Sequence, residues 1–452
     1  MKKKLKKLST THLIMLSFLA VIFTGSILLA LPVSSADGKA VPYIDALFTA
    51  TTSTCVTGLV TLTTSTAWST FGHIVILTLI QIGGLGLITV ISGIMLAFQK
   101  KMSIGNRILI QDAFNLNTMS GLAQFVKKVL MGTFTVEAVG AALYMIVFVP
   151  RFGLRGVWIS IFNSISAFCN AGIDIFAENS LCDYATNPIV NFVTCALIIL
   201  GGIGYIVWWD VLRVTKLFKK QKHRYLRNLT LHSKIAISAT FVLIILGAVV
   251  TFLFEYNNPD TIKNFTLFEK IQFSFFQSVT TRTAGFATVP QENLTSGSAL
   301  FSMILMFIGG SPVGTAGGVK TVTIVTLLVS AYASVSNKNE ATIFHRSLSE
   351  SAVRKAVAVS CVSFFTLLVS TLLMCATTDA SLLDILYETT SATATVGLTR
   401  NLTSSLNIWG KIIIIATMYL GRVGPISLAV AFTLKKDNQN LITTPTENIS
   451  VG

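Results

Sequence analysis

A short segment that recurs four times constrains this 452-residue chain more than any other feature. Each copy holds a glycine followed by a bulky apolar residue, and an aromatic residue stands ten positions earlier. The four glycine pairs are Gly58-Leu59, Gly172-Ile173, Gly285-Phe286 and Gly397-Leu398, and the aromatic residues are Phe48, Phe162, Phe275 and Tyr387. Successive glycines are 112 to 114 residues apart, about a quarter of the chain. The spacing therefore predicts four repeats of one unit, each completed by the others.

The hydropathy of the chain places these repeats in a membrane. Hydrophobic residues make up 52% of the chain and charged residues 12%, whereas soluble domains carry about 25% charged residues. A large soluble protein is therefore excluded. Apolar stretches near the roughly 20 residues of a membrane span occur at 13–33, 74–98, 129–149, 189–209, 235–254, 356–376 and 411–432, and a longer, interrupted one at 298–335. We expect an all-α membrane protein with eight transmembrane helices, two per repeat.

The charge distribution predicts how these spans are oriented. Of the 34 Lys and Arg residues, 24 lie before the first span, in the loops 99–128, 213–234 and 335–355, or at 435–436. These segments share one side, which the positive-inside rule assigns to the cytoplasm together with both termini. The net charge of +15 then indicates topology and contact with anionic membrane lipid. The basic loop 219–224 is compatible with RNA, but we expect no nucleic-acid partner.

Each repeat follows the same predicted plan of a span, a short segment, the glycine and a second span. We place the repeats at 1–122, 123–233, 234–352 and 353–452, the last including a C-terminal tail. Their pore segments are 43–59, 157–173, 267–286 and 382–398. The short segments Tyr43–Thr54, Val157–Phe168, Leu267–Thr281 and Leu382–Thr393 are too short to cross a bilayer. They suit re-entrant half-helices, because irregular backbone at that depth must line a protein-enclosed or watery cavity.

Four half-helices that converge on one axis predict a cation site. The C-terminal end of a helix is partially negative, and backbone carbonyls beyond it can replace the water shell of an ion. Glycine permits the positive φ that such backbone needs. The predicted ion-binding residues are Val56, Thr57, Gly58, Asn170, Ala171, Gly172, Thr283, Ala284, Gly285, Thr395, Val396 and Gly397. Potassium is the first candidate, sodium is left open, and no organic cofactor is expected. The alternative is that the glycines only permit close helix packing.

The second span of the third repeat differs from the others. The spans carry glycine-rich points at 83–86, 201–204, 309–312 and 421–424, and small residues permit close helix contact in lipid. Region 298–335 would be about 57 Å long as one helix, against a bilayer core of about 30 Å. We therefore predict a broken helix with a gating loop formed by Gly309, Gly310, Ser311, Pro312, Val313, Gly314, Thr315, Ala316, Gly317, Gly318 and Lys320. Because Val319 precedes the lysine, the loop is not a Walker A motif.

Three charged residues fall in apolar surroundings. Arg422 lies within the last span and is predicted either to bind carbonyls of the broken helix or to form a positive barrier, with a purely structural tie as the alternative. Arg282 lies three residues before Gly285, where a positive charge would either perturb the cation site or connect the third filter segment to an acid such as Glu269, and we expect the structural connection. Glu137 is expected to pair with a lysine or with polar backbone. The six cysteines show no metal-binding spacing, and most are expected to be small buried hydrophobes.

The four filter segments, the loop 309–320 and the stretch 421–424 resemble the Trk/Ktr/HKT superfamily of potassium transporters, most closely the bacterial KtrB-type membrane subunit. The resemblance implies four membrane–pore–membrane repeats around one central pore, with the loop as the gate and Arg422 in contact with it. It also implies a homodimer with the C-terminal tail near the dimer contact. Finally, it implies a separate cytosolic ring of nucleotide-binding RCK subunits docked on the basic inner face.

The expected function is potassium uptake across the cell membrane through a channel-like filter. The alternative is a sodium- or proton-coupled potassium symporter that works by alternating access. A membrane enzyme is a third class, and we expect none because the sequence contains no HExxH, GxSxG or paired-carboxylate motif.

Overall fold

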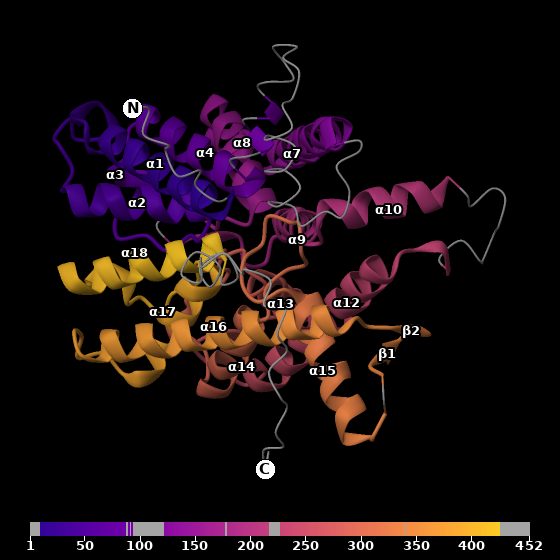
Figure 1. The fold of residues 1–452 in the computed structure, drawn as a ribbon. Coiled ribbons are helices and arrows are strands. Elements are labelled where there is room, and N and C mark those ends of the chain that lie inside the picture. Colours follow the sequence, from indigo (N-terminus) through magenta and orange to yellow (C-terminus); the bar gives the residue numbers. More distant parts are fainter. Residues whose placement is uncertain are drawn as a thin grey trace, which may run out of the picture.

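The computed structural model is mostly helical, with little strand (Figure 1). It describes residues 10–86, 89–90, 92–93, 122–176, 179–216, 227–338 and 340–424. The N-terminal lysines, the basic loop 219–224 and the predicted C-terminal tail lie outside these ranges.

One long helix opens each predicted repeat. These helices are α1 (Thr10–Ala30), α7 (Leu122–Phe152), α12 (Leu231–Glu255) and α16 (Glu350–Cys375). In the described part of the chain they are the four single helices long and apolar enough to cross a membrane. Large apolar side chains such as Phe241 and Leu253 are more than half exposed on them, as expected for faces in contact with lipid. The helices α7, α12 and α16 begin one to three residues before the predicted repeat boundaries at 123, 234 and 353.

A shorter helix follows each long one, where the half-helices were predicted. These helices, here named pore helices after the pore segments predicted from the sequence, are α2 (Tyr43–Cys55), α8 (Leu154–Cys169), α13 (Leu267–Thr280) and α17 (Leu382–Ala394). With 13 to 16 residues each, they are about 20 to 24 Å long, shorter than the bilayer core. Side-chain caps mark the N-termini of two of these helices, α17 and α13. Ser381 accepts from the Asp384 N–H, and Thr266 and Glu269 form a capping box.

The second helices are shorter than the sequence predicts. They are α4 (Thr70–Leu85), α9 (Pro188–Gly202) with α10 (Tyr205–Thr215), α14 (Ser296–Phe307) with α15 (Thr321–Val335), and α18 (Ile408–Val423). The span predicted at 189–209 is not straight, because α9 and α10 meet at 95° and together form a broken span or a re-entrant loop. The helices α4 and α18 end inside the predicted spans 74–98 and 411–432, whose last residues lie outside the described ranges.

A left-handed glycine causes these interruptions. Gly86, Gly204 and Gly424 have φ values of 81°, 94° and 91°, and an α-helix cannot continue through such a backbone. In the third repeat, helix α14 ends before the loop predicted to break the span, and α15 begins after it.

Short elements complete the connections. They are α3 (Thr64–Ala67), η1 (Pro32–Ser34), η2 (Cys182–Tyr184), η4 (Gln291–Asn293) and η5 (Thr403–Ser405), with a small antiparallel hairpin of β1 (Thr342–Ile343) and β2 (Arg346–Ser347).

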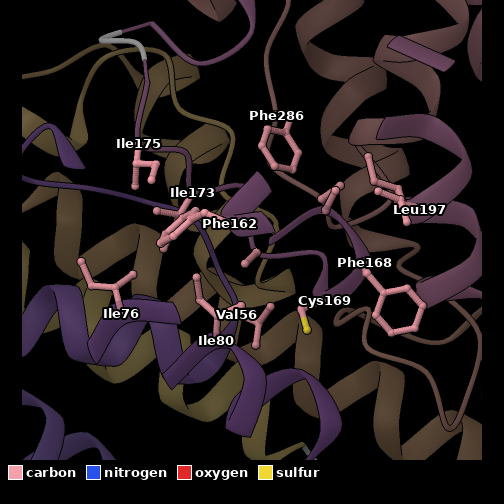
Figure 2. Close-up of a cluster of buried hydrophobic side chains, with 14 of the residues drawn as sticks. Val56, Ile76, Ile80, Phe162, Phe168, Cys169, Ile173, Ile175, Leu197 and Phe286 are labelled. Atoms are coloured by element: carbon pink, nitrogen blue, oxygen red, sulfur yellow. The ribbon is translucent and has the colours of Figure 1, made fainter. Parts of the chain in front are cut away.

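The repeats pack in chain order and close on themselves. Helix α4 packs against α8, α9 against α13, α14 against α17, and α18 returns to α2. A buried apolar cluster fills the junction of the first two repeats and reaches the third. Figure 2 shows Val56, Phe162, Ile173 and Phe286 in this cluster, with Ile76 and Ile80 of α4. Bulky residues that follow the predicted filter glycines thus anchor those segments in the core.

Two cysteines differ from the prediction of burial. Cys361 and Cys375 are exposed on α16, whereas Cys55, Cys169 and Cys195 are buried. The exposed pair lies on a helix whose large apolar side chains are also exposed, so the surface suits contact with lipid.

Candidate ion pathway

The four repeated glycines meet in one closed ring. A side chain on each glycine would collide with the carbonyl oxygen of the residue that precedes the glycine of the next repeat. A Cβ atom added at Gly58 would lie 2.5 Å from the oxygen of Ala171, at Gly172 2.5 Å from that of Ala284, at Gly285 2.5 Å from that of Val396, and at Gly397 2.2 Å from that of Thr57. Real Cβ atoms essentially never come this close. The structure thus places four glycines and four carbonyl groups together.

A strained residue stands two positions before each glycine. Val56, Asn170, Thr283 and Thr395 have φ between 51° and 69°, and all four are buried. This left-handed conformation costs about 1–2 kcal/mol per non-glycine residue. Hydrogen bonds of the Schellman type hold three of these turns. The Thr57 N–H, for example, donates to the Thr52 carbonyl at 2.8 Å.

The third segment turns more tightly than the other three. The Ala284 N–H bonds to the carbonyl four residues back, at Thr280, whereas the equivalent bond in the other repeats reaches five residues back. The aromatic position therefore moves by one residue. Phe276 is buried and Phe275 is 41% exposed, so the assignment of Phe275 to the repeated aromatic position is wrong.

A vestibule opens on one side of the ring. Its volume is about 390 Å³, and all four glycines contribute to its lining. The other lining residues lie mostly just beyond the glycines and are largely polar, among them Thr61, Thr399 and Asn401, with the acids Asp174 and Glu292. Water and a hydrated ion can thus reach the ring from this side.

The loop 309–320 lies against the break between α9 and α10. Ser311 and Thr315 donate their backbone N–H groups to the carbonyls of Gly202 and Gly201, at 2.8 and 3.1 Å. The Tyr205 N–H donates to the Val313 carbonyl at 2.9 Å. The freed backbone groups at the end of α9 are therefore satisfied by the loop, which explains why the two interruptions occur together.

The same loop contacts the ends of three pore helices. The Thr315 hydroxyl lies 3.0 Å from the Phe168 carbonyl and 3.1 Å from Asn170 Oδ1. The Gly317 N–H donates to the Thr283 hydroxyl at 3.0 Å. A Cβ on Gly317 would lie 1.9 Å from Thr395 Oγ1. Because these partners precede the ring glycines, the loop lies on the side of the ring away from the vestibule.

The base of the loop is closed by backbone hydrogen bonds. The Gly309 N–H donates to the Val319 carbonyl, and the Thr321 N–H to that of Gly310, each at 3.0 Å. The remaining loop positions are also tightly placed. A Cβ on Gly314 would lie 2.8 Å from the Gly201 oxygen, the Pro312 carbonyl faces Gly204, and Gly318 has a φ of 67°.

Two cations hold the loop through its carbonyl oxygens. Arg422 donates through Nη1 to the Thr315 carbonyl at 2.7 Å, and through Nη2 to that of Gly83 in α4. Lys320 donates to the carbonyls of Ala316 and Gly317. Among the described residues neither cation forms an ion pair. Arg422 therefore joins the third repeat to the first, and the Gly83 contact is one that the sequence pattern did not reveal.

The other buried charges have different partners from those expected. Arg282 donates to the Thr240 hydroxyl of α12 at 3.3 Å, whereas Glu269 serves the helix cap described above. The predicted Arg282–Glu269 contact is therefore wrong. Glu137 is bound by the Gln81 side chain at 3.1 Å, not by a lysine, and lies 4.0 Å from Cys169 at the end of α8.

Comparison with known proteins agrees with this architecture. The family model described as "TrkH: Cation transport protein" matches residues 5–442. The chain therefore belongs to this family of cation transport proteins, which are not enzymes.

Particular relatives refine the class. The chain is 38% identical over 459 aligned positions to the potassium/sodium uptake protein NtpJ of Enterococcus hirae, covering 100% of this chain and 99% of the relative. It is 38% identical to the Ktr system potassium uptake protein B of Bacillus subtilis, covering 97% and 95%. A solved structure, the potassium transporter TrkH from Vibrio parahaemolyticus, matches with a TM-score of 0.77 at 16% identity, over 96% of this chain and 87% of that one.

Proposed function

We propose that this chain is the translocating subunit of a potassium uptake system, with four membrane–pore–membrane repeats around one pore. The observation that carries the proposal is the closed ring of four glycines and four carbonyl groups below a polar vestibule. Relatives that share the whole length of the chain are named potassium uptake proteins.

Selection would occur at the ring. Backbone carbonyl oxygens would replace the water shell of a large, weakly hydrated cation, and the negative ends of the four pore helices would favour a positive charge there. The buried left-handed residues hold these carbonyls in place despite their strain. Potassium would then enter passively, driven by a membrane potential equivalent to about 2.3 kcal/mol per charge per 100 mV.

The loop 309–320 would act as the gate. It lies beneath the ring and is held by Arg422 and by the break in the second repeat. Because the Thr315 carbonyl and hydroxyl connect Arg422 to the end of α8, displacement of the loop would release contacts in the second and fourth repeats together.

The proposed assembly is a homodimer with a cytosolic regulatory ring. The name "Ktr system" of the Bacillus subtilis relative suggests a multi-component system. The basic loops predicted on the inner face provide a positive surface for nucleotide-binding RCK subunits, and both termini would lie in the cytoplasm of a multi-pass cell-membrane protein.

Growth rescue tests the function. We expect expression of the chain to restore growth of a potassium-uptake-deficient bacterium at low potassium, and to do so more fully with a co-expressed ring subunit. Uptake of ⁸⁶Rb⁺ by the same cells separates transport from indirect effects on growth. Membrane-inserted protein that supports neither growth nor rubidium uptake in either setting would overturn the proposal.

Coupled transport is the second candidate, because one relative is named a potassium/sodium uptake protein. In proteoliposomes, a fixed stoichiometry between potassium and sodium or proton flux would support coupling and alternating access. Single-ion currents that persist without a second ion would support a pore.

A further inference from the structure

A buried glutamate lies behind the vestibule wall of the fourth repeat. Glu388 belongs to the pore helix α17, is fully buried, and stands nine residues before Gly397. Its carboxylate accepts hydrogen bonds from the Thr399 hydroxyl, at 2.7 Å, and from the Thr403 hydroxyl. Both threonines line the vestibule. One carboxylate thus accepts hydrogen bonds from two side chains of the segment that follows the ring glycine.

The carboxylate has hydroxyl partners instead of a cation. In the described part of the chain Glu388 forms no ion pair, and the nearby Arg400 binds Asp384 at 2.7 Å. Hydrogen bonds to a charged acceptor are about twice as strong as neutral ones. An acid buried in this way is costly, and such a residue at membrane depth is by default a functional candidate.

Hydrogen bonds join this wall of the vestibule to the wall formed by the third repeat. Arg400 donates to the Gln291 and Glu292 carbonyls at 2.8 and 3.1 Å. The Tyr387 hydroxyl donates to Gln291 Oε1 at 2.9 Å. The stretch of the fourth filter segment between Gly397 and Thr403 is therefore the part that Glu388 holds in place against this wall.

The other repeats have no acid at the equivalent position. Thr49 and Asn163 stand nine residues before their glycines, and Gln277 follows the buried aromatic of the third repeat, as Glu388 follows Tyr387. All three are buried but uncharged. The fourth segment is thus the one whose position depends on a carboxylate.

We propose that Glu388 is a positioning residue that sets the selectivity of the ring for potassium over sodium, an inference that rests on the proposed function. Its hydrogen bonds with Thr399 and Thr403 keep Gly397 packed against the Thr57 carbonyl. They also keep the Val396 carbonyl packed against Gly285. Loss of these hydrogen bonds lets the fourth segment move outward, which widens the ring where this segment meets the first and third segments. A wider, softer ring discriminates less between the two ions.

The experiment measures the ratio of potassium to sodium permeability in proteoliposomes, because a variant that merely lowers the amount of folded protein leaves this ratio unchanged. E388Q replaces one acceptor oxygen with a donor NH₂ group, and we expect the ratio to fall about tenfold. T403V removes one donor at nearly constant shape and should lower the ratio in the same direction. The double variant should be less than additive, because both changes break the same contact.

E350Q is the matched control. Glu350 is an exposed acid at the start of α16, outside the vestibule, so its neutralisation removes one charge without touching the Glu388 contacts, and the ratio should stay near that of the wild type. A selective wild type with E388Q and T403V both unchanged would overturn the inference and leave the proposed function intact. An equal loss in E350Q would show that the ratio responds to the removal of any acid and would also overturn it. If E388Q does not fold, T403V and T399V decide the outcome. A wild type without potassium flux would instead contradict the proposed function.

Discussion

At the scale of single residues, the ring depends on positions where the backbone has a positive φ and where a neighbouring repeat leaves little or no space for a side chain. Gly397 has a φ of 99° and lies against backbone of the first repeat, so both conformation and space exclude a side chain. Val56 has a left-handed backbone although it is β-branched, which is a genuine outlier for this residue type. Such strain persists only where surrounding contacts over-determine it, and here the neighbouring repeats supply those contacts.

Replacing Gly397 with Ser should weaken potassium selectivity. The new side chain would meet the Thr57 carbonyl and carry about 1–2 kcal/mol of backbone strain, so the ring must open. The measurement is the potassium-to-sodium permeability ratio. Gly38→Ser is the control, because Gly38 also has a positive φ of 68° but has open space, with no atom within 4 Å, where a Cβ would be added. Unchanged selectivity in Gly397→Ser would argue against the filter assignment.

Replacing Arg422 with Ala should raise basal flux and leave the permeability ratio unchanged. The substitution removes the link between the Thr315 and Gly83 carbonyls, so the closed loop loses a support away from the ring. Arg422→Lys keeps the charge, but a single ammonium cannot reproduce the planar fork of arginine. A rise in basal flux in both variants identifies loss of the contact with the two carbonyls as the cause. A rise in Arg422→Ala alone identifies loss of the positive charge as the cause. An Ala variant that only fails to fold would favour a purely structural role.

At the scale of elements, paired interruptions replace what would otherwise be regular spans. The break between α9 and α10 leaves free backbone groups, and the loop between α14 and α15 supplies their partners. Neither interruption would satisfy its buried polar groups alone. The loop is thus an ordered element that depends on a second repeat, which suits a part that moves between two arrangements.

Deleting Ser311–Ala316 should increase basal ion flux severalfold. The deletion removes the Ser311 and Thr315 contacts to the second repeat, together with the chain that lies beneath the ring. Flux of ⁸⁶Rb⁺ into proteoliposomes measures the effect. Ser311→Ala serves as a milder companion, since it loses only a hydroxyl contact with Thr321. Equal flux in the wild type and the deletion would remove the gating role.

At the scale of the whole molecule, four units are joined into a ring that no single unit can form. Contacts run from the first repeat through the fourth and back to the first, and each glycine is packed by the next repeat in this order. The consequence is a single vestibule whose lining is drawn from all four repeats. Long apolar helices surround this centre, in agreement with membership of a family of cation transport proteins.

The predicted membrane orientation can be tested by cysteine labelling of intact cells. In a background in which Cys182, Cys361 and Cys375 are replaced with Ser, a membrane-impermeant maleimide should label Gly38→Cys directly, because Gly38 is exposed in the connection before α2. Ser336→Cys, exposed at the end of α15, should react only after permeabilisation. The reverse pattern would contradict the assignment of the basic loops to the cytoplasm.

The sequence alone determined the helical membrane class and the positions of the four pore helices, because hydropathy, charge asymmetry and the glycine period are all written along the chain. Only the tertiary structure decided which partner each buried polar or charged group contacts and where the helices break. Continuous apolar sequence cannot reveal that α9 ends at a left-handed glycine, that Arg422 reaches Gly83, or that Arg282 contacts Thr240 in place of Glu269. The register of the third segment was equally hidden, because one residue fewer in its turn moves the buried aromatic from Phe275 to Phe276. Buried polar groups choose partners by proximity in space, and residues more than a hundred positions apart become neighbours only when the repeats close.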